Sequence, residues 1–160
     1  MRFVIIGAGR VGLRTARVLR EEGHQVTLVE RDRDRAEYAR DADFEVIDGD
    51  GSREDVLREA GIEDADGLGA LTSDLNVNFA ACSIAKHNRT WTVLRVDEDY
   101  REGVYQEYAD EVDEVVYPER LGAIGAKNAL LGGSVRATPD IAPPPQVVQL
   151  TPPTDSPVPR

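Results

Sequence analysis

Three glycines near the start of the chain have the spacing of a phosphate-binding loop. Gly7, Gly9 and Gly12 follow the apolar run 3–6 in the pattern Gly-x-Gly-x-x-Gly. The first allows a sharp turn, the second lets a pyrophosphate approach the backbone, and the third lets the next helix pack closely on the strand. The N-terminus of that helix then offers unpaired N–H groups and a positive dipole end to an anion. This spacing predicts a dinucleotide site.

A carboxylate follows at the interval that such a site requires. Glu30 ends the apolar run 25–29 and lies 18 residues after Gly12, close to the usual interval of about 20. We expect it to accept hydrogen bonds from ribose hydroxyls and to disfavour a 2′-phosphate, because two anions repel. Arg31 reduces that repulsion. The alternative interpretation is a glycine turn in an α/β fold that binds no ligand.

Further polar residues follow later strands, at the edge where open parallel sheets bind ligands. Asp50, in the turn before Ser52, is placed to accept from an adenine amino group; alternatively, Asp50 is a turn residue and Ser52 a helix cap. Asn78 reaches the ribose or the nicotinamide side, or serves local hydrogen bonds. Arg10 is placed to meet the terminal phosphates, which a guanidinium binds bidentately, and Arg95 is placed to meet a phosphate or an acidic partner. The candidate cofactor-binding residues are Gly7, Gly9, Arg10, Val11, Gly12, Glu30, Arg31, Asp50, Gly51, Thr72, Asn78 and Arg95.

Alternating strands and helices position these residues. Apolar periodicity predicts strands over 2–6, 25–30, 45–48, 67–71, 91–96 and 115–117. Helices are predicted over 10–22, 32–40, 52–61, 75–86, 98–109 and 119–131, the third with Ser52 and Asp55 as a capping pair. This alternation predicts an α/β, Rossmann-like doubly wound parallel sheet of six strands in the order 3-2-1-4-5-6.

The end of the chain differs in composition. Eight of the nine prolines lie between Pro139 and Pro159. We therefore expect a nucleotide-binding domain over residues 1–133 and a Pro-rich tail over 134–160 that is extended or disordered. A partner-binding proline segment is the alternative for this tail.

Composition excludes several classes of protein. The formal net charge is −11 and the isoelectric point is about 4.6, which argues against a nucleic-acid partner. Lysine occurs only at Lys86 and Lys127, which suits either a high-salt cytoplasm or an arginine-rich proteome. Cys82 stands alone and reads as a packing residue. The chain has no apolar run of 18 residues and enters a strand by residue 3, so we expect no membrane span, no signal peptide and a cytoplasmic location.

The order of the motifs resembles a known family. The glycine loop, the acid after the second strand, the Gly49-Asp50-Gly51-Ser52 turn, residues 60–66 and Asp74-x-Asn76-x-Asn78 follow one another as in the RCK N-terminal domain, also called TrkA-N or KTN. The resemblance covers about residues 1–131. It is carried more specifically by residues 60–66 and the asparagine pair than by the glycines.

This resemblance implies a regulatory module rather than an enzyme. Members of the family bind NAD(H) or adenine nucleotides and regulate potassium channels and transporters at the membrane. They assemble through dimers into rings, so we expect a homo-oligomer in which helix 119–131 joins subunits. Such regulators often continue into a second domain where this sequence has its Pro-rich segment, which implies that ligand sensing through such a domain is either absent or supplied by another chain.

Two other functions remain open at the level of sequence. An NAD-dependent oxidoreductase needs a positioned acid or base, but the sequence has no Tyr-x-x-x-Lys pair. His24 precedes the second strand and His87 ends a helix, so both are expected away from the cleft. The third reading is a nucleotide-binding adaptor without a transporter partner.

Overall fold

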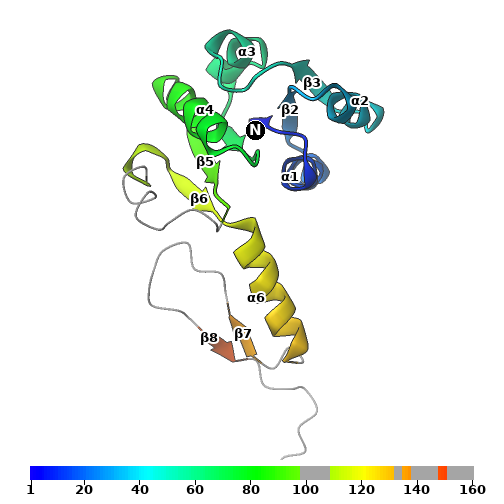
Figure 1. The fold of residues 1–160 in the computed structure, drawn as a ribbon, viewed down its shortest axis with the longest axis vertical. Coiled ribbons are helices and arrows are strands. Elements are labelled where there is room, and N and C mark those ends of the chain that lie inside the picture. Colours follow the sequence, from blue (N-terminus) through cyan, green and yellow to red (C-terminus); the bar gives the residue numbers. More distant parts are fainter. Residues whose placement is uncertain (98–108, 132–134, 138–147, 151–160) are drawn as a thin grey trace, which may run out of the picture. The chain divides into compact units, whose positions relative to one another are not determined.

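Six parallel strands form one sheet within residues 1–116. The computed structural model describes residues 1–97, 109–131, 135–137 and 148–150. The strand order is β3-β2-β1-β4-β5-β6, which confirms the predicted doubly wound sheet (Figure 1). The strands are β1 Arg2–Ile6, β2 Gln25–Glu30, β3 Glu45–Asp48, β4 Gly67–Ala70, β5 Trp91–Arg95 and β6 Glu114–Val116.

Helices cover the sheet on both faces. The helices are α1 Arg10–Glu21, α2 Arg33–Asp41, α3 Glu54–Glu59 and α4 Leu75–His87, with short 3-10 turns η1 Ile62–Asp64 and η2 Ala109–Glu111. Parallel neighbours in one sheet are joined by right-handed crossovers. Because the chain moves from β1 to β3 in one direction and from β4 to β6 in the other, α1 and α2 cover one face while α3 and α4 cover the other (Figure 1).

The apolar side chains of β1 suit its position in the middle of the sheet, between β2 and β4. Val4, Ile5 and Ile6 are each 2% exposed, as expected for a strand that is buried on both faces. Ile5 packs in a cluster with Leu13 of α1 and Leu28 of β2. Burying a side chain of this size stabilises the fold by about 1.5–3 kcal/mol.

The pairing of β1 creates the edge at which the candidate residues gather. Ile6 is opposite Val29 of β2 and Ala70 of β4, so these three strands end at nearly the same level. The strand order reverses between β1 and β4, and this switch point opens the crevice in which doubly wound sheets bind ligands.

The start of α3 differs from the prediction. Ser52 is not the N-cap; the cap position is Arg53, which makes no side-chain capping bond. Asp50 Oδ1 instead accepts both the Ser52 N–H (2.9 Å) and the Ser52 hydroxyl (2.7 Å), which holds Ser52 in the preceding turn. The predicted capping pair with Asp55 was therefore wrong. The predicted helix 98–109 lies outside the described residues except for its last residue.

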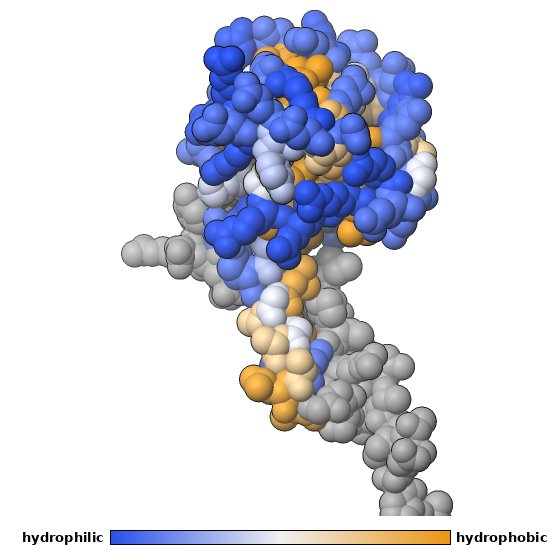
Figure 2. Space-filling view, turned by 90° about the vertical axis from the view of Figure 1, so that its right-hand side faces the viewer, coloured by the Kyte–Doolittle hydropathy of each residue, from blue (hydrophilic) through white to orange (hydrophobic). Residues whose placement is uncertain are grey.

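A second compact unit, Tyr117–Arg160, follows the first, Met1–Val116. It contains α6, Pro118–Leu130, and a short antiparallel pair of β7, Val135–Ala137, with β8, Val148–Leu150. None of the α6 residues is buried, and apolar side chains gather on this helix, as Figure 2 shows; Leu121 and Leu130 are among them. The β7–β8 pair was not predicted, and a domain boundary after residue 133 stays a prediction. In the described segments, no helix is both long and apolar enough to cross a bilayer.

The sole cysteine, Cys82, is buried between helix α4 and strand β5. Cys82 of α4 is 0% exposed, and its Sγ lies 3.8 Å from the carbonyl oxygen of Val93. Burial raises the pKa of this thiol to about 12, and the nearby Asp113 carboxylate adds to the effect. The thiol is therefore protonated and unreactive in the folded state.

Asp113 ties the edge strand β6 to the rest of the sheet. Its Oδ2 accepts from the Thr92 N–H (2.8 Å) and hydroxyl (2.9 Å), and its Oδ1 pairs with the Lys86 ammonium. Burial acts to raise the pKa of Asp113, but the hydrogen bonds from Lys86 and Thr92 together outweigh it and hold this pKa below the ordinary value. The charged carboxylate is thus the form that the fold stabilises.

We expect acid to weaken the fold through this group. Because the folded-state pKa is depressed, its contribution is complete above the ordinary pKa of about 3.9 and is lost as the pH falls below it. Asp113→Asn should lower the free energy of unfolding at pH 7 by about 1–2 kcal/mol and flatten its decline below about pH 4. Urea titrations at several pH values measure this, with the exposed Asp41→Asn as control. An unchanged pH slope in Asp113→Asn would refute the assignment.

Candidate functional site

Of the three glycines in the loop, Gly7 and Gly12 have no room for a side chain, whereas Gly9 has open space around it. Gly7 has a φ of +94°, and its N–H donates to the carbonyl of Val29 (2.8 Å). A Cβ on Gly12 would stand 1.8 Å from the Gly7 carbonyl oxygen, so helix α1 packs directly on the turn. A Cβ on Gly9 would meet no heavy atom within 4 Å. The loop therefore leaves open space at the residue that a pyrophosphate must approach.

The N-terminus of α1 is not capped by a side chain. Gly9 is the cap residue, makes no capping bond, and no acid lies in the first turn. By contrast, α2 is capped by Asp32 and α4 by Asp74. The N–H groups at the start of α1, with those of Arg10 and Val11 among them, are thus available to an anion. Arg10 is exposed and makes no ion pair with any described residue.

Glu30, the last residue of β2, is hydrogen-bonded to the glycine loop. It is 6% exposed, its Oε2 accepts from the Ala8 N–H (2.7 Å), and its Oε1 accepts from the Asp32 N–H (2.9 Å). Sequence reasoning missed this bridge between the glycine loop and the turn after β2. A carboxylate has about four acceptor positions, so two backbone bonds leave capacity for ribose hydroxyls. The ribose contact itself stays a prediction.

The turn after β3 packs against the end of β1. A Cβ on Gly51 would stand 2.2 Å from Ile6 Cγ2, so only glycine fits this approach. The hydroxyl of Ser52 is the main reason that the pKa of Asp50 is lowered, and the charge of Arg31 contributes. Arg31 is itself exposed. Asp50 is thus a turn residue, although Ser52 is not the helix cap that the alternative interpretation paired with it, and the contact of Asp50 with adenine stays a prediction.

The side chain of Asn78 is buried at the start of α4. It is 1% exposed, and its amide bonds four times to protein atoms: to the N–H, hydroxyl and carbonyl of Thr72 and to the carbonyl of Arg95. Both donors and the acceptor oxygen are therefore occupied. This arrangement leaves no amide group for the ribose or nicotinamide and corresponds to the local alternative.

Arg95 lies at the end of β5 with a carboxylate beside it. Its Nη1 donates to the Leu71 carbonyl (3.2 Å), and its Nε pairs with Asp97 Oδ1 (3.0 Å). The side chain is 14% exposed. The acid two residues further along the chain is the signal from which this pair is predictable. A phosphate contact by Arg95 remains a prediction.

The predicted residues thus form two groups at one edge of the sheet. The glycine loop, Glu30 and the Asp50 turn lie on the β1–β2–β3 side, while Thr72 and Arg95 lie on the β4–β5 side. Thr72 joins the groups, because its Cγ2 lies 2.9 Å from the position of a Cβ on Gly7.

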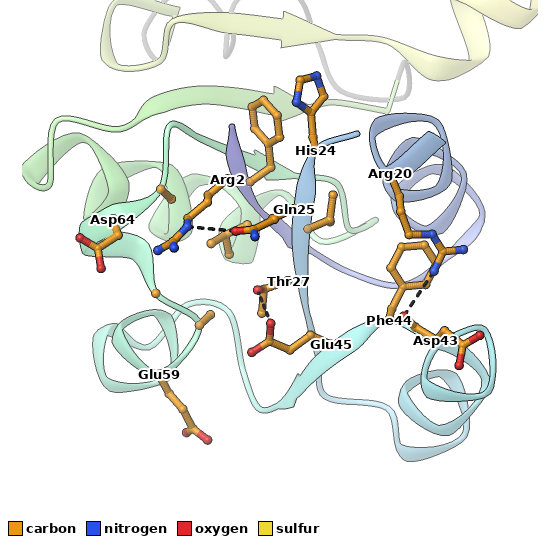
Figure 3. A pocket seen from close by; sticks show the side chains of 16 residues that line it. Arg2, Arg20, His24, Gln25, Thr27, Asp43, Phe44, Glu45, Glu59 and Asp64 are labelled. Atoms are coloured by element: carbon orange, nitrogen blue, oxygen red, sulfur yellow. Dashed lines mark hydrogen bonds between the residues drawn. The ribbon is translucent and has the colours of Figure 1, made fainter. Parts of the chain in front are cut away.

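A separate cavity of about 530 Å³ lies at the opposite edge, beside the first residues of β1, β2 and β3 (Figure 3). Its polar groups bond to one another: Arg2 Nε donates to Gln25 (3.0 Å), and Arg20 donates to the Ala42 carbonyl while lying over the Phe44 ring. In the described part of the chain no cluster of acidic, His or Cys side chains could hold a metal. This cavity is distinct from the crevice at the carboxyl ends of the strands, where the candidate residues lie.

Comparison with known proteins places this arrangement in a family context. Residues 3–118 match the TrkA-N domain family, and this match ends close to Val116, the last residue of the first compact unit. The Trk system potassium uptake protein TrkA homolog of Pyrococcus abyssi is 37% identical over 129 residues, which cover 77% of this chain and 57% of that protein. The chain therefore spans about half the length of this curated relative.

Solved structures share the fold. The RCK domain of GsuK is 27% identical, with a TM-score of 0.67, over 86% of this chain and 31% of that one. A structure of the GsuK channel bound to NAD is 22% identical, with a TM-score of 0.60, over 72% of this chain and 21% of that one. At this identity the second likeness indicates the fold alone.

Proposed function

Because the chain belongs to the TrkA-N domain family, we propose that it is the nucleotide-binding part of a regulator of potassium transport. The observation that carries the proposal is the uncapped start of α1 beside the open space at Gly9. Glu30 lies next to it and retains acceptor capacity. These groups match the two most polar parts of an adenine nucleotide, the phosphates and the ribose.

The proposed ligand is NAD(H), with ATP or ADP as the alternative. The side of the crevice formed by Glu30 and Asp50 suits an adenosine, whereas Thr72 and Arg95 suit the second half of a dinucleotide. The GsuK channel, which shares this fold, has been solved with NAD, and this supports the same class of ligand. Arg10, exposed at the start of α1, is the proposed contact for the distal phosphates.

The proposed mode of action is a shift between conformations rather than turnover. A ligand shifts such an equilibrium only through its different affinity for the two states. The proposed partner is a membrane-embedded potassium transporter subunit, bound at the cytoplasmic face, and the regulator is proposed to be a homo-oligomer. The exposed leucines of α6, Leu121 and Leu130, support association with another protein surface.

Isothermal titration calorimetry tests the ligand proposal. NADH, NAD, ATP and ADP are titrated into the full chain at low and high salt, and we expect saturable one-site binding of at least one of them. Absence of binding by all four would overturn the proposal. Steady consumption of NADH with a defined co-substrate would favour an oxidoreductase instead.

We also expect NADH to bind more tightly than NADPH. The buried carboxylate of Glu30 would face the 2′-phosphate, and two anions in a partly desolvated site repel. Arg31→Ala should widen the preference, because it removes the nearby cation. Competition titrations of the two cofactors against wild type and Arg31→Ala measure this. Tighter binding of NADPH by the wild type is the contrary result.

A further inference from the structure

We propose that Asn78 is a positioning residue, whose amide aligns the carboxyl ends of β4 and β5 so that the crevice accepts the second half of a two-part nucleotide. The proposal rests on the nucleotide-binding function inferred above. It assigns Asn78 no contact with the ligand.

The backbone of Asn78 is itself firmly anchored. The residue lies in the first turn of α4, and its N–H donates to the carbonyl of Asp74 (3.0 Å). The Asp74 carboxylate caps the same turn by accepting from Asn76 and Val77 N–H groups. The side-chain amide is therefore held by a fixed helix end, and the residue is only 1% exposed.

This amide extends the strand pairing beyond its natural end. The last pair between β4 and β5 is Ala70 with Leu94, so Thr72 and Arg95 lie past the β4–β5 ladder, although Arg95 still pairs with Val116 of β6. Asn78 Nδ2 donates to the Thr72 carbonyl (2.9 Å) and to the Arg95 carbonyl (3.1 Å), and so bonds the two chain segments to each other. Its Oδ1 accepts from the Thr72 N–H (3.0 Å) and hydroxyl (2.6 Å).

The aligned segments are those that border the crevice. Thr72 Cγ2 lies 2.9 Å from the position of a Cβ on Gly7, so the place of Thr72 fixes the gap between the glycine loop and β4. Arg95 reaches across to the Leu71 carbonyl (3.2 Å). Glu30 and Asp50, on the other side of the switch point, have no bond to Asn78 among the described residues.

The two halves of a ligand should therefore respond differently to a change at Asn78. Asn78→Asp keeps the shape but replaces two donors by a carboxylate oxygen that faces two carbonyl oxygens. Thr72 and Arg95 then separate, while the loop, Glu30 and Asp50 keep their bonds. We expect affinity for NADH to fall about tenfold, the effect of one lost buried interaction. Affinity for AMP, which reaches only the adenosine side, should stay within about twofold.

The experiment compares NADH and AMP by calorimetry on the full chain. The matched control is Asn88→Asp, the same chemical change at the other end of α4, where the amide donates to the Ile84 carbonyl (3.0 Å) and, among the described residues, to no strand. It should lower stability and leave the NADH-to-AMP affinity ratio unchanged. Asn78→Ser, which removes the amide without adding charge, is the second variant, and thermal melts establish that each variant is folded.

The outcomes separate the possibilities. A selective loss of NADH affinity in Asn78→Asp or Asn78→Ser supports the positioning role. A proportional loss of NADH and AMP affinity, or no loss of either, overturns it and leaves Asn78 a residue of general stability. Failure of the wild type to bind NADH also overturns the positioning role, whereas the proposed function falls only if NADH, NAD, ATP and ADP all fail to bind.

Discussion

Gly12→Ala is expected to destabilise the protein by about 3 kcal/mol or more and to abolish nucleotide binding. The added methyl would stand 1.8 Å from the carbonyl oxygen of Gly7 and 3.0 Å from its carbonyl carbon. Both contacts are with backbone, so no side chain can rotate to relieve them. Helix α1 has to move off β1, and with it Leu13, which is buried in the core cluster.

Gly9→Ala provides the matched control for this prediction. A Cβ at Gly9 meets no heavy atom within 4 Å, and its φ of −76° suits any residue. The free energy of unfolding should change by less than about 0.5 kcal/mol, yet nucleotide affinity should fall, because the methyl fills the space that the pyrophosphate needs. Urea denaturation and calorimetry measure the two quantities. Equal stability losses in both variants would contradict the loop geometry.

Glu30→Gln is expected to impair both the fold and the binding site. The carboxylate now accepts one N–H on each oxygen, from Ala8 and Asp32. A carboxamide places its NH₂ group against one of these donors and leaves a buried N–H without an acceptor, which costs about 1–3 kcal/mol. It also presents fewer acceptors to the ribose, so we expect nucleotide affinity to fall about tenfold or more.

The control for this change is Glu45→Gln, at the exposed start of β3 and the opposite edge of the sheet. It should leave both stability and affinity close to wild type. Denaturation curves and calorimetry on the same samples distinguish the two effects of Glu30→Gln. Wild-type stability together with reduced affinity would show that Glu30 serves only the ligand; wild-type affinity would remove it from the site.

Features set by local pattern were predictable from the sequence. The alternation of apolar strands and helices indicated all six strands of the sheet, and the right-handed crossover rule then allowed few orders. The glycine spacing indicated which residues had to be small, and the structure agrees at Gly12, where a side chain has no room. In these cases the physical cause lies within a few residues of its effect.

Features that depend on competition between partners were not predictable in the same way. Ser52 and Asp55 are residue types that often form a capping pair. The Ser52 hydroxyl instead donates to Asp50, which is only two residues away. Asn78 has the chemistry of a ribose contact, yet Arg95, 17 residues away, takes one of its donors. Such outcomes follow from distances that only the folded chain sets.

The buried thiol of Cys82 allows local opening between α4 and β5 to be measured by chemical labelling. Because its pKa is about 12 and its side chain is fully enclosed, a thiol reagent reacts only when α4 lifts from β5. The rate of labelling then measures the population of that opened form. Asn78 bonds the first turn of the same helix to the ends of β4 and β5, so anything that tightens this end of the crevice should slow the labelling of Cys82. Labelling of this native cysteine therefore measures local opening without an engineered labelling site.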